Sequence, residues 1–422
     1  MDVATIIEGA AAGRVLVVGS PPPAGRDWDL MLRDPDRAAV QTALESNGFE
    51  PVRGAWARFG LSGVELVELL GPTDWGLSAT EAQELFAQAR GLDGHSHLCT
   101  PSPTHRLLIL ARKLPRTPGL LAPHHRRALE EALAQSPDSF EQARLRAREW
   151  GVSRRLNRLE SRSRHRPRRR WPPRYLRLPR RGAVVTLSGL DGVGKSTQAQ
   201  ALGASLRTLG YDATVVWAPI GSSLALRRFA TAVKLGLTRL PVGPLAHAEP
   251  QTAHRRLLAD VEGTVESSGH PRKLVAAAWS TVITLANAVS YRRAARGTRT
   301  RGRIVIYDRY VLDTIVELRF SYAPHGRLPL QEGLVRRLAP RPLCAFWLDA
   351  PAEVAHARKP DWSLAQTRLR ARLYRDGSAA VDACWLDAQR PAEDLTAAIT
   401  REVLHTLDSK RKRRVVARRT AR

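Results

Sequence analysis

Short apolar runs alternate with amphipathic stretches along much of the chain, which is the pattern of an α/β protein. Residues 14–19 predict a buried strand, residues 36–48 a helix and residues 64–70 a second apolar strand. Between about residues 101 and 150 the leucines recur at helical spacing. The first 150 residues therefore predict a small α/β domain with a helical extension.

A second series of strands begins at residue 183. Five apolar runs, each bounded by turn or helix signals, predict the strands of a parallel sheet: 183–188, 211–217, 303–307, 343–348 and 383–386. A helix over residues 198–209 separates the first two runs, as a crossover connection between parallel strands requires. We therefore predict a C-terminal α/β domain over residues 182–408, with a mostly parallel sheet flanked by helices.

Charge separates these two domains from a linker and a tail. The formal net charge is +27, but residues 144–181 hold sixteen arginines against two glutamates, and residues 409–422 hold eight basic residues and no acid. Prolines also interrupt the first segment, so we predict an Arg/Pro-rich linker over 151–181 and a basic tail over 409–422. Both segments could contact nucleic acid, and the alternative is a solvated, disordered linker and tail.

Cysteine usage and hydropathy point to a reducing compartment and to no membrane span. The three cysteines lie far apart and match neither a disulfide framework nor a zinc site. The N-terminus lacks the positive region of a secretory signal. The uncharged run Leu274–Tyr291 is interrupted by serine, threonine and asparagine, so we expect a buried helix there rather than a spanning one. We expect a cytoplasmic protein without a membrane segment.

The first strand of the C-terminal domain leads directly into a phosphate-binding sequence. Its residues are Gly189, Leu190, Asp191, Gly192, Val193, Gly194, Lys195, Ser196 and Thr197, a Walker A loop. The glycines let backbone N–H groups surround phosphate oxygens, and the following helix directs its positive end toward them. Lys195 is expected to reach the β- and γ-phosphates of ATP, and the Ser196 hydroxyl to bind Mg²⁺.

Two further residues complete the predicted catalytic site. The strand 303–307 places Asp308 at its carboxyl end, where ligands bind in open α/β sheets. Asp308 can therefore bind Mg²⁺ through a water molecule, as a Walker B acid does. Arg309 follows at once, and its planar guanidinium suits the phosphate that accepts the transferred group.

Three motifs together resemble those of thymidylate kinases, a family of P-loop nucleoside monophosphate kinases. They are Gly-Leu-Asp-Gly-Val-Gly-Lys-Ser-Thr-Gln at 189–198, Asp-Arg-Tyr at 308–310 and Leu-Asp-Ala-Pro-Ala-Glu-Val at 348–354, and the resemblance covers about residues 182–408. It implies transfer of the γ-phosphoryl group of Mg-ATP to a nucleoside monophosphate, with dTMP as the first candidate. It also implies a homodimer, as is common in the family.

The same resemblance implies roles for individual residues. Asp191 would contact the acceptor's sugar hydroxyl, Arg309 and Tyr310 the acceptor, and Asp308 a metal-bound water. Arg292 precedes Asp308 at roughly the spacing of a family arginine that holds the acceptor. A mobile lid would lie between residues 353 and 374. A solvated helix face is an equally good interpretation of this segment, and the pattern does not single out one arginine. Its basic residues are Arg358, Lys359, Arg368, Arg370 and Arg372.

One departure from the family leaves the acceptor open. Thymidylate kinases usually carry Arg-Glu-Pro-Gly after the second strand, whereas this chain has Trp-Ala-Pro-Ile-Gly at 217–221. A P-loop kinase or ATPase acting on another phosphorylated acceptor therefore remains an alternative. A nucleic-acid-associated protein that uses the basic linker and tail is a further one.

The N-terminal domain carries a weaker signature. Gly19 and Ser20 end a strand, Asp27 and Asp29 lie two residues apart on the next, and Glu68 lies on a third. This arrangement resembles the nucleotidyltransferase fold, which implies a triphosphate at the Gly-Ser pair and two Mg²⁺ ions on the three carboxylates. Solvent-facing acids on a small α/β domain are the alternative.

Overall fold

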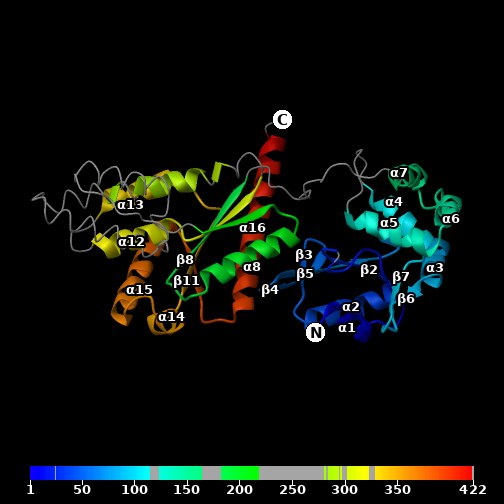
Figure 1. Ribbon diagram of the computed structural model, residues 1–422, viewed down its shortest axis with the longest axis horizontal. Coiled ribbons are helices and arrows are strands. Elements are labelled where there is room, and N and C mark those ends of the chain that lie inside the picture. Colours follow the sequence, from blue (N-terminus) through cyan, green and yellow to red (C-terminus); the bar gives the residue numbers. More distant parts are fainter. Residues whose placement is uncertain are drawn as a thin grey trace, which may run out of the picture. The chain divides into compact units, whose positions relative to one another are not determined.

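The computed structural model describes most of the two predicted domains (Figure 1). It describes residues 1–23, 25–114, 123–163, 182–217, 280–281, 284–293, 295–296, 302–322 and 328–420. The chain divides into two compact units, Met1–Arg58 with Val64–Arg174, and Phe59–Gly63 with Tyr175–Arg422. Each unit is described by itself below.

The first unit is built on a seven-stranded mixed sheet in the order β3-β4-β5-β2-β1-β7-β6. Its strands are β1 (Val15–Val17), β2 (Trp28–Met31), β3 (Glu50–Val52), β4 (Ala55–Gly60), β5 (Gly63–Leu70), β6 (Arg90–Gly91) and β7 (Leu98–Thr100). Strand β2 runs parallel to β5 and antiparallel to β1, and β1 runs parallel to β7. The predicted strands at 14–19 and 64–70 are confirmed, and the sheet is wider than they indicated.

Helices pack on both faces of this sheet and form a hydrophobic core on each face. They are α1 (Val3–Ala10), α2 (Asp34–Ser46), α3 (Ala79–Ala87), α4 (Pro103–Lys113), α5 (Pro123–Gln135), α6 (Ser139–Arg146) and α7 (Ser153–Ser163), with the 3-10 turn η1 (Thr73–Trp75). Val15 and Val17 of β1 pack with α1 and α2, whereas Leu16 packs with the group that contains α4. Successive strand residues point to opposite faces, so β1 is apolar at every position.

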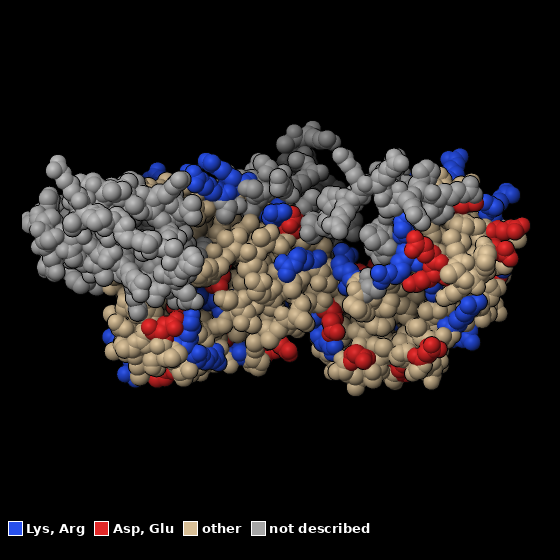
Figure 2. Space-filling view, in the orientation of Figure 1, with Lys and Arg blue, Asp and Glu red and all other residues tan. Residues whose placement is uncertain are grey.

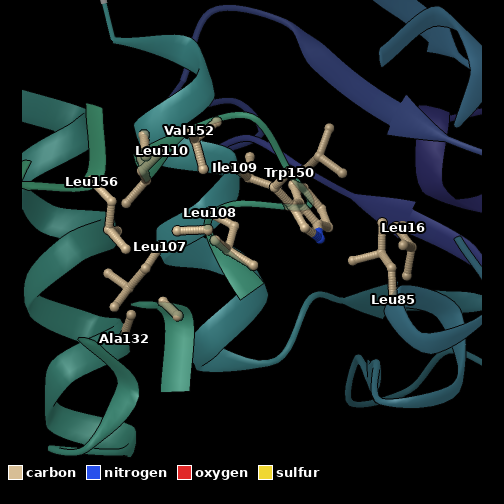
Figure 3. Packing of buried hydrophobic residues seen from close by; sticks show 14 of the residues in the cluster. Leu16, Leu85, Leu107, Leu108, Ile109, Leu110, Ala132, Trp150, Val152 and Leu156 are labelled. Atoms are coloured by element: carbon tan, nitrogen blue, oxygen red, sulfur yellow. The ribbon is translucent and has the colours of Figure 1, made fainter. Parts of the chain in front are cut away.

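The helical extension ends later than predicted. The sequence predicts a linker over 151–181, but residues 153–163 form α7, and Leu156 and Leu159 are almost completely buried. They join the core of the first unit beside Trp150 and Val152 (Figure 3). The sequence did not predict this helix because its two leucines lie among many arginines. The rest of the predicted linker, 164–181, lies outside the described residues.

The second unit holds a five-stranded, fully parallel sheet in the order β12-β11-β8-β10-β9. The strands are β8 (Ala183–Gly189), β9 (Ala213–Trp217), β10 (Ile304–Asp308), β11 (Cys344–Asp349) and β12 (Cys384–Asp387). All five match strands predicted from the sequence. Strand β8 lies in the centre, and the chain continues to one side of it in β9 and β10 and to the other in β11 and β12. The strand order therefore reverses at β8, which is where α/β sheets bind ligands.

Helices cover both faces of this sheet (Figure 1). They are α8 (Lys195–Thr208), α12 (Val311–Tyr322), α13 (Pro329–Leu338), α14 (Ala352–Arg358), α15 (Leu364–Ser378) and α16 (Ala392–Thr420), with the 3-10 turn η3 (Ala379–Val381). Val305 and Tyr307 of β10 pack toward α12, whereas Ile306 between them lies near α8. The predicted α/β class is confirmed. The predicted basic tail begins inside α16, whose backbone runs to Thr420.

The expected absence of a membrane-spanning helix and the distribution of charge can be compared with the described residues. Among those residues, no helix is both long and apolar enough to cross a membrane. Part of Leu274–Tyr291 lies outside them, and residues 284–291 are helical. On the face drawn in Figure 2, acidic and basic side chains are interspersed over the described parts of each unit.

Candidate functional site

The Walker A loop connects β8 to α8 and is held by close backbone contacts. Gly189, Gly192 and Gly194 have φ angles of 146°, 89° and 89°, a region that side chains rarely adopt. A Cβ atom on Gly189 would lie 2.3 Å from the carbonyl oxygen of Leu348, and one on Gly192 would lie 2.4 Å from that of Ala355. The loop is therefore packed against the end of β11 and against α14, and glycine is required at both positions.

Lys195 is the first residue of α8, and its side chain folds back over the loop. Its Nζ donates to the carbonyl oxygens of Gly189 at 2.7 Å and Leu190 at 2.6 Å, and it lies 3.6 Å from Oδ1 of Asp191. The side chain is almost fully buried, and burial lowers the pKa of the amine against the opposing effect of Asp191. A phosphate can replace the two carbonyls as a stronger, charged acceptor.

Ser196 and Asp308 meet across the sheet edge, as predicted. Strand β10 pairs with β8 so that Asp308 lies opposite Leu187, and the Ser196 hydroxyl donates to Oδ2 of Asp308 at 2.5 Å. The other carboxylate oxygen, Oδ1, is buried and has no hydrogen-bond partner among the described residues. A hydroxyl beside an unpartnered carboxylate oxygen is the hard oxygen set that Mg²⁺ prefers. The residues therefore fit the ion that the sequence predicts.

Arg309 and Asp191 form an ion pair next to this site. Burial alone would favour neutral forms, yet the pKa of Arg309 is raised by Asp191, and the pKa of Asp191 is lowered by Lys195 and Arg309. Arg309 also has a φ of 75°, which is uncommon for a residue with a side chain. The sequence placed both residues at the site, and the structure brings them together.

Arg370 of α15 is the basic residue of the predicted lid that the structure singles out. Arg370 as a whole is 4% exposed. Its guanidinium pairs with Oε2 of Glu317 at 2.9 Å and lies over the rings of Phe320 and Trp362. One of its nitrogens, Nη1, is buried without a hydrogen-bond partner among the described residues. The positive charges of Arg370 and Lys359 also act to lower the pKa of Asp191. By contrast, Arg368 pairs with the exposed Glu353.

Asp313 and Tyr374 were missed by the sequence analysis. Asp313 accepts hydrogen bonds from the Tyr310 backbone N–H at 2.9 Å and from the Tyr374 hydroxyl at 2.8 Å, and it is 1% exposed. It thereby fixes the first turn of α12 directly after Arg309 and ties it to α15. The only signal in the sequence was an acid placed in the first turn of a helix.

Tyr310 and Arg292, which the resemblance assigned to the acceptor, have structural contacts here. The Tyr310 ring packs with Tyr291 and Tyr307, and its hydroxyl donates to the carbonyl of Pro340 at 2.7 Å. Arg292 is exposed, and its Nε donates to the carbonyl of Leu338 at 2.6 Å. Within the described residues, neither side chain hydrogen-bonds to the Walker A loop.

The three N-terminal acids also come together. The β2–β5 register places Asp29 opposite Glu68, and Asp27 directly precedes β2. One oxygen from each of the three carboxylates lies within 4.8 Å of the others. A Cβ on Gly19 would lie 2.5 Å from Oδ2 of Asp29, so the predicted Gly-Ser turn passes close to the cluster. Burial and the charges of Asp29 and Asp27 raise the pKa of Glu68.

Lys113, at the end of α4, is part of this acidic cluster and was not predicted. Its Nζ lies 2.5 Å from Oδ2 of Asp29. One positive charge thus balances part of the charge of three carboxylates. Nothing in the sequence near Lys113 indicated this, because the contact joins residues 84 positions apart.

Comparison of the chain with known protein families and with curated proteins gives no match. The chemistry of the two sites is therefore argued from their own residues.

Proposed function

We propose that the second unit is a phosphotransferase that binds Mg-ATP and transfers its γ-phosphoryl group to a nucleoside monophosphate, with dTMP as the first candidate. One observation carries this proposal. A glycine loop with a buried lysine, a serine–aspartate oxygen pair and an Arg–Asp pair meet at the carboxyl edge of a parallel sheet, where the strand order reverses. This set of groups has the charges that phosphoryl transfer requires.

Each residue has a role that follows from its position. The loop N–H groups and Lys195 would hold the phosphates of ATP, with Lys195 exchanging two backbone carbonyls for phosphate oxygens. Ser196 and Asp308 would hold Mg²⁺, which supplies positive charge to the transferring group. Arg309 would bind the acceptor phosphate. In the reaction, the bond between the γ-phosphorus and its bridging oxygen breaks, and an acceptor phosphate oxygen forms the new bond.

Arg370 would add charge close to the phosphates. Its unpartnered Nη1 is a donor without an acceptor, and a buried donor of this kind gains free energy when an anion arrives. Lys359 lies beside Gly192, where a Cβ would approach its side chain at 3.3 Å. The predicted lid region thus supplies two cations near the loop.

The test is formation of ADP and of a phosphorylated product by the purified chain. Mg-ATP is supplied with a panel of nucleoside monophosphates that includes dTMP, and Lys195→Ala serves as the blank. Formation of dTDP by the wild type alone supports the proposal. If ATP binds but no nucleoside monophosphate is phosphorylated, the acceptor is another phosphorylated molecule. If ATP does not bind, the proposal of a phosphotransferase is wrong.

A second candidate function concerns the first unit. The observation that favours it is the convergence of Asp27, Asp29 and Glu68 beside the Gly19-Ser20 turn, in the arrangement that a nucleotidyltransferase would use for two-ion catalysis. The test is incorporation of label from α-labelled nucleoside triphosphates, with Asp29→Asn as the control. Incorporation that Asp29→Asn leaves unchanged would exclude this cluster as its source.

A further inference from the structure

A cavity of about 990 Å³ lies in the second unit, lined by residues other than those of the phosphate site. Its floor is formed by β8 and β11, and its walls by the start of α12, the end of α13 and the turn η3. Residues 342–346 and 379–384 line it at the amino-terminal ends of β11 and β12. The Walker A loop follows the carboxyl end of β8, so the cavity approaches the loop at Ser188 and extends from there to the amino-terminal ends of β11 and β12.

Two buried hydroxyl side chains form part of the floor. Thr186 and Ser188 are each 2% exposed and lie on the face of β8 that is directed toward α12. Neither side chain makes a hydrogen bond to another described residue. Neither hydroxyl oxygen is closed off from the cavity, so each can donate a hydrogen bond to an occupant in place of water.

The cavity also carries unpaired positive charge. Arg336 and Arg337 lie in the last turn of α13, and Arg341 follows shortly after. Within the described part of the chain, Arg337 and Arg341 form no ion pair. Two acids, Asp382 and Glu402, also line the cavity, so the arginines exceed them by one. Guanidinium groups bind phosphates and carboxylates through paired hydrogen bonds.

Apolar side chains complete the lining of the cavity and favour a ligand that has an apolar part besides its anionic group. Val311, Leu312, Phe346 and Val381 all face the cavity. A pocket that combines apolar side chains with a few convergent polar groups is typical of sites for small organic ligands. Its volume is large enough for a molecule with one ring and an anionic group.

We infer that this cavity is a second ligand site, which binds a small organic oxyanion: a phosphate or carboxylate group attached to an apolar ring. The arginines bind the anionic group, the Thr186 and Ser188 hydroxyls donate to its oxygens, and the ring packs on Leu312 and Phe346. The site adjoins the phosphate site in sequence at two points, because Ser188 precedes Gly189 and Tyr310 follows Arg309. It is separate from the proposed kinase function.

The test uses phenyl phosphate as the probe and isothermal titration calorimetry of the full chain with excess Mg-ADP. We expect one saturable site per chain, with no binding of benzyl alcohol, which lacks the anion. Two double variants, Arg337→Gln/Arg341→Gln and Thr186→Val/Ser188→Ala, should each weaken binding at least about tenfold. The exposed Arg293→Gln is the matched control and should bind as the wild type does.

Several outcomes distinguish the inference from its alternatives. Lys195→Ala should bind the probe unchanged, so that a failure of the kinase proposal leaves this result intact. Melting temperatures show whether the double variants remain folded, and the arginine pair, which is exposed, carries the test if the hydroxyl pair does not fold. Absence of saturable binding, or equal binding by wild type and the arginine variant, would overturn the inference and leave a water-filled cavity.

Discussion

The two carboxylate-bearing sites of this protein balance their charge in opposite ways. In the second unit, Asp191 lies between two cations, Lys195 and Arg309, and its pKa is lowered although it is buried. In the first unit, Lys113 pairs with Asp29 and Arg26 lies 3.6 Å from Asp27, yet the pKa of Glu68 is raised by burial and by the two aspartates. The difference fits the proposed roles, which are anion binding at the site of the second unit and cation binding at the site of the first.

The sites also differ in how they are assembled. The loop, Lys195 and Ser196 are contiguous, so one strand–turn–helix segment sets their geometry. The acidic cluster needs strands β2 and β5 in register and the end of α4 above them. A contiguous site depends on local backbone conformation, whereas a dispersed one depends on the stability of the whole unit.

The largest expected effect tests the charge of the phosphate site. Lys195→Ala should lower the rate of phosphoryl transfer by about 100-fold to 1,000-fold, because it removes a positive charge aimed at the transferring group. The rate of ADP formation measures this. Arg207→Ala, at the far end of the same helix, is the control and should retain full activity. An equal loss in both variants would mean that α8, not the charge, is responsible.

The need for glycine in the Walker A loop can be tested by adding one methyl group at Gly192. Gly192→Ala places a Cβ against the carbonyl of Ala355 at a φ of 89°, so it should weaken ATP binding by about 30-fold, equivalent to about 2 kcal/mol. Calorimetric titration with Mg-ATP measures the change. Gly9→Ala, at an open position in the last turn of α1, is the matched control and should stabilise the protein by about 0.5 kcal/mol.

The first unit should instead respond to pH through His105. This residue is fully buried near the start of α4, its Nε2 has no hydrogen-bond partner among the described residues, and burial lowers its pKa to about 4. The unfolded chain takes up the proton near pH 6.5, so stability is lost as the pH falls from 6.5 toward 4.

Between pH 7 and pH 5 this amounts to about 2 kcal/mol of unfolding free energy for the first unit. Urea unfolding at the two pH values, followed by hydrogen exchange of the amides of α4, measures it. His105→Gln cannot gain the proton and should remove this part of the pH dependence. A variant with the same pH dependence as the wild type would assign the loss to other groups.

The smallest expected effect concerns Lys113. Lys113→Met removes the cation that contacts Asp29, so the affinity of the first unit for Mn²⁺ should rise by about tenfold, equivalent to about 1.4 kcal/mol. Electron paramagnetic resonance of free Mn²⁺ measures this. Asp29→Asn in the same background should abolish the gain. An unchanged affinity would show that Lys113 does not compete for the cluster.

The sequence predicted those features whose determinants lie close together or at strand ends. The strand–loop–helix around Lys195 is specified by adjacent residues, and Asp308 was found because an acid ends an apolar run. Arg370 could not be separated from its neighbours, because only the packing of α15 against α12 buries it beside Glu317. Lys113 was not predicted at all, since its partner Asp29 lies on a distant strand. Long-range packing therefore decides these residues.

The burial of α7 has a practical consequence for dividing this protein into fragments. A recombinant piece ending at residue 150, as the charge pattern would suggest, lacks Leu156 and Leu159 and would expose the apolar side chains they cover, among them those of α4. Such a piece would tend to aggregate when expressed. A fragment that extends through residue 163 retains this helix and is the better starting point for studying the first unit alone.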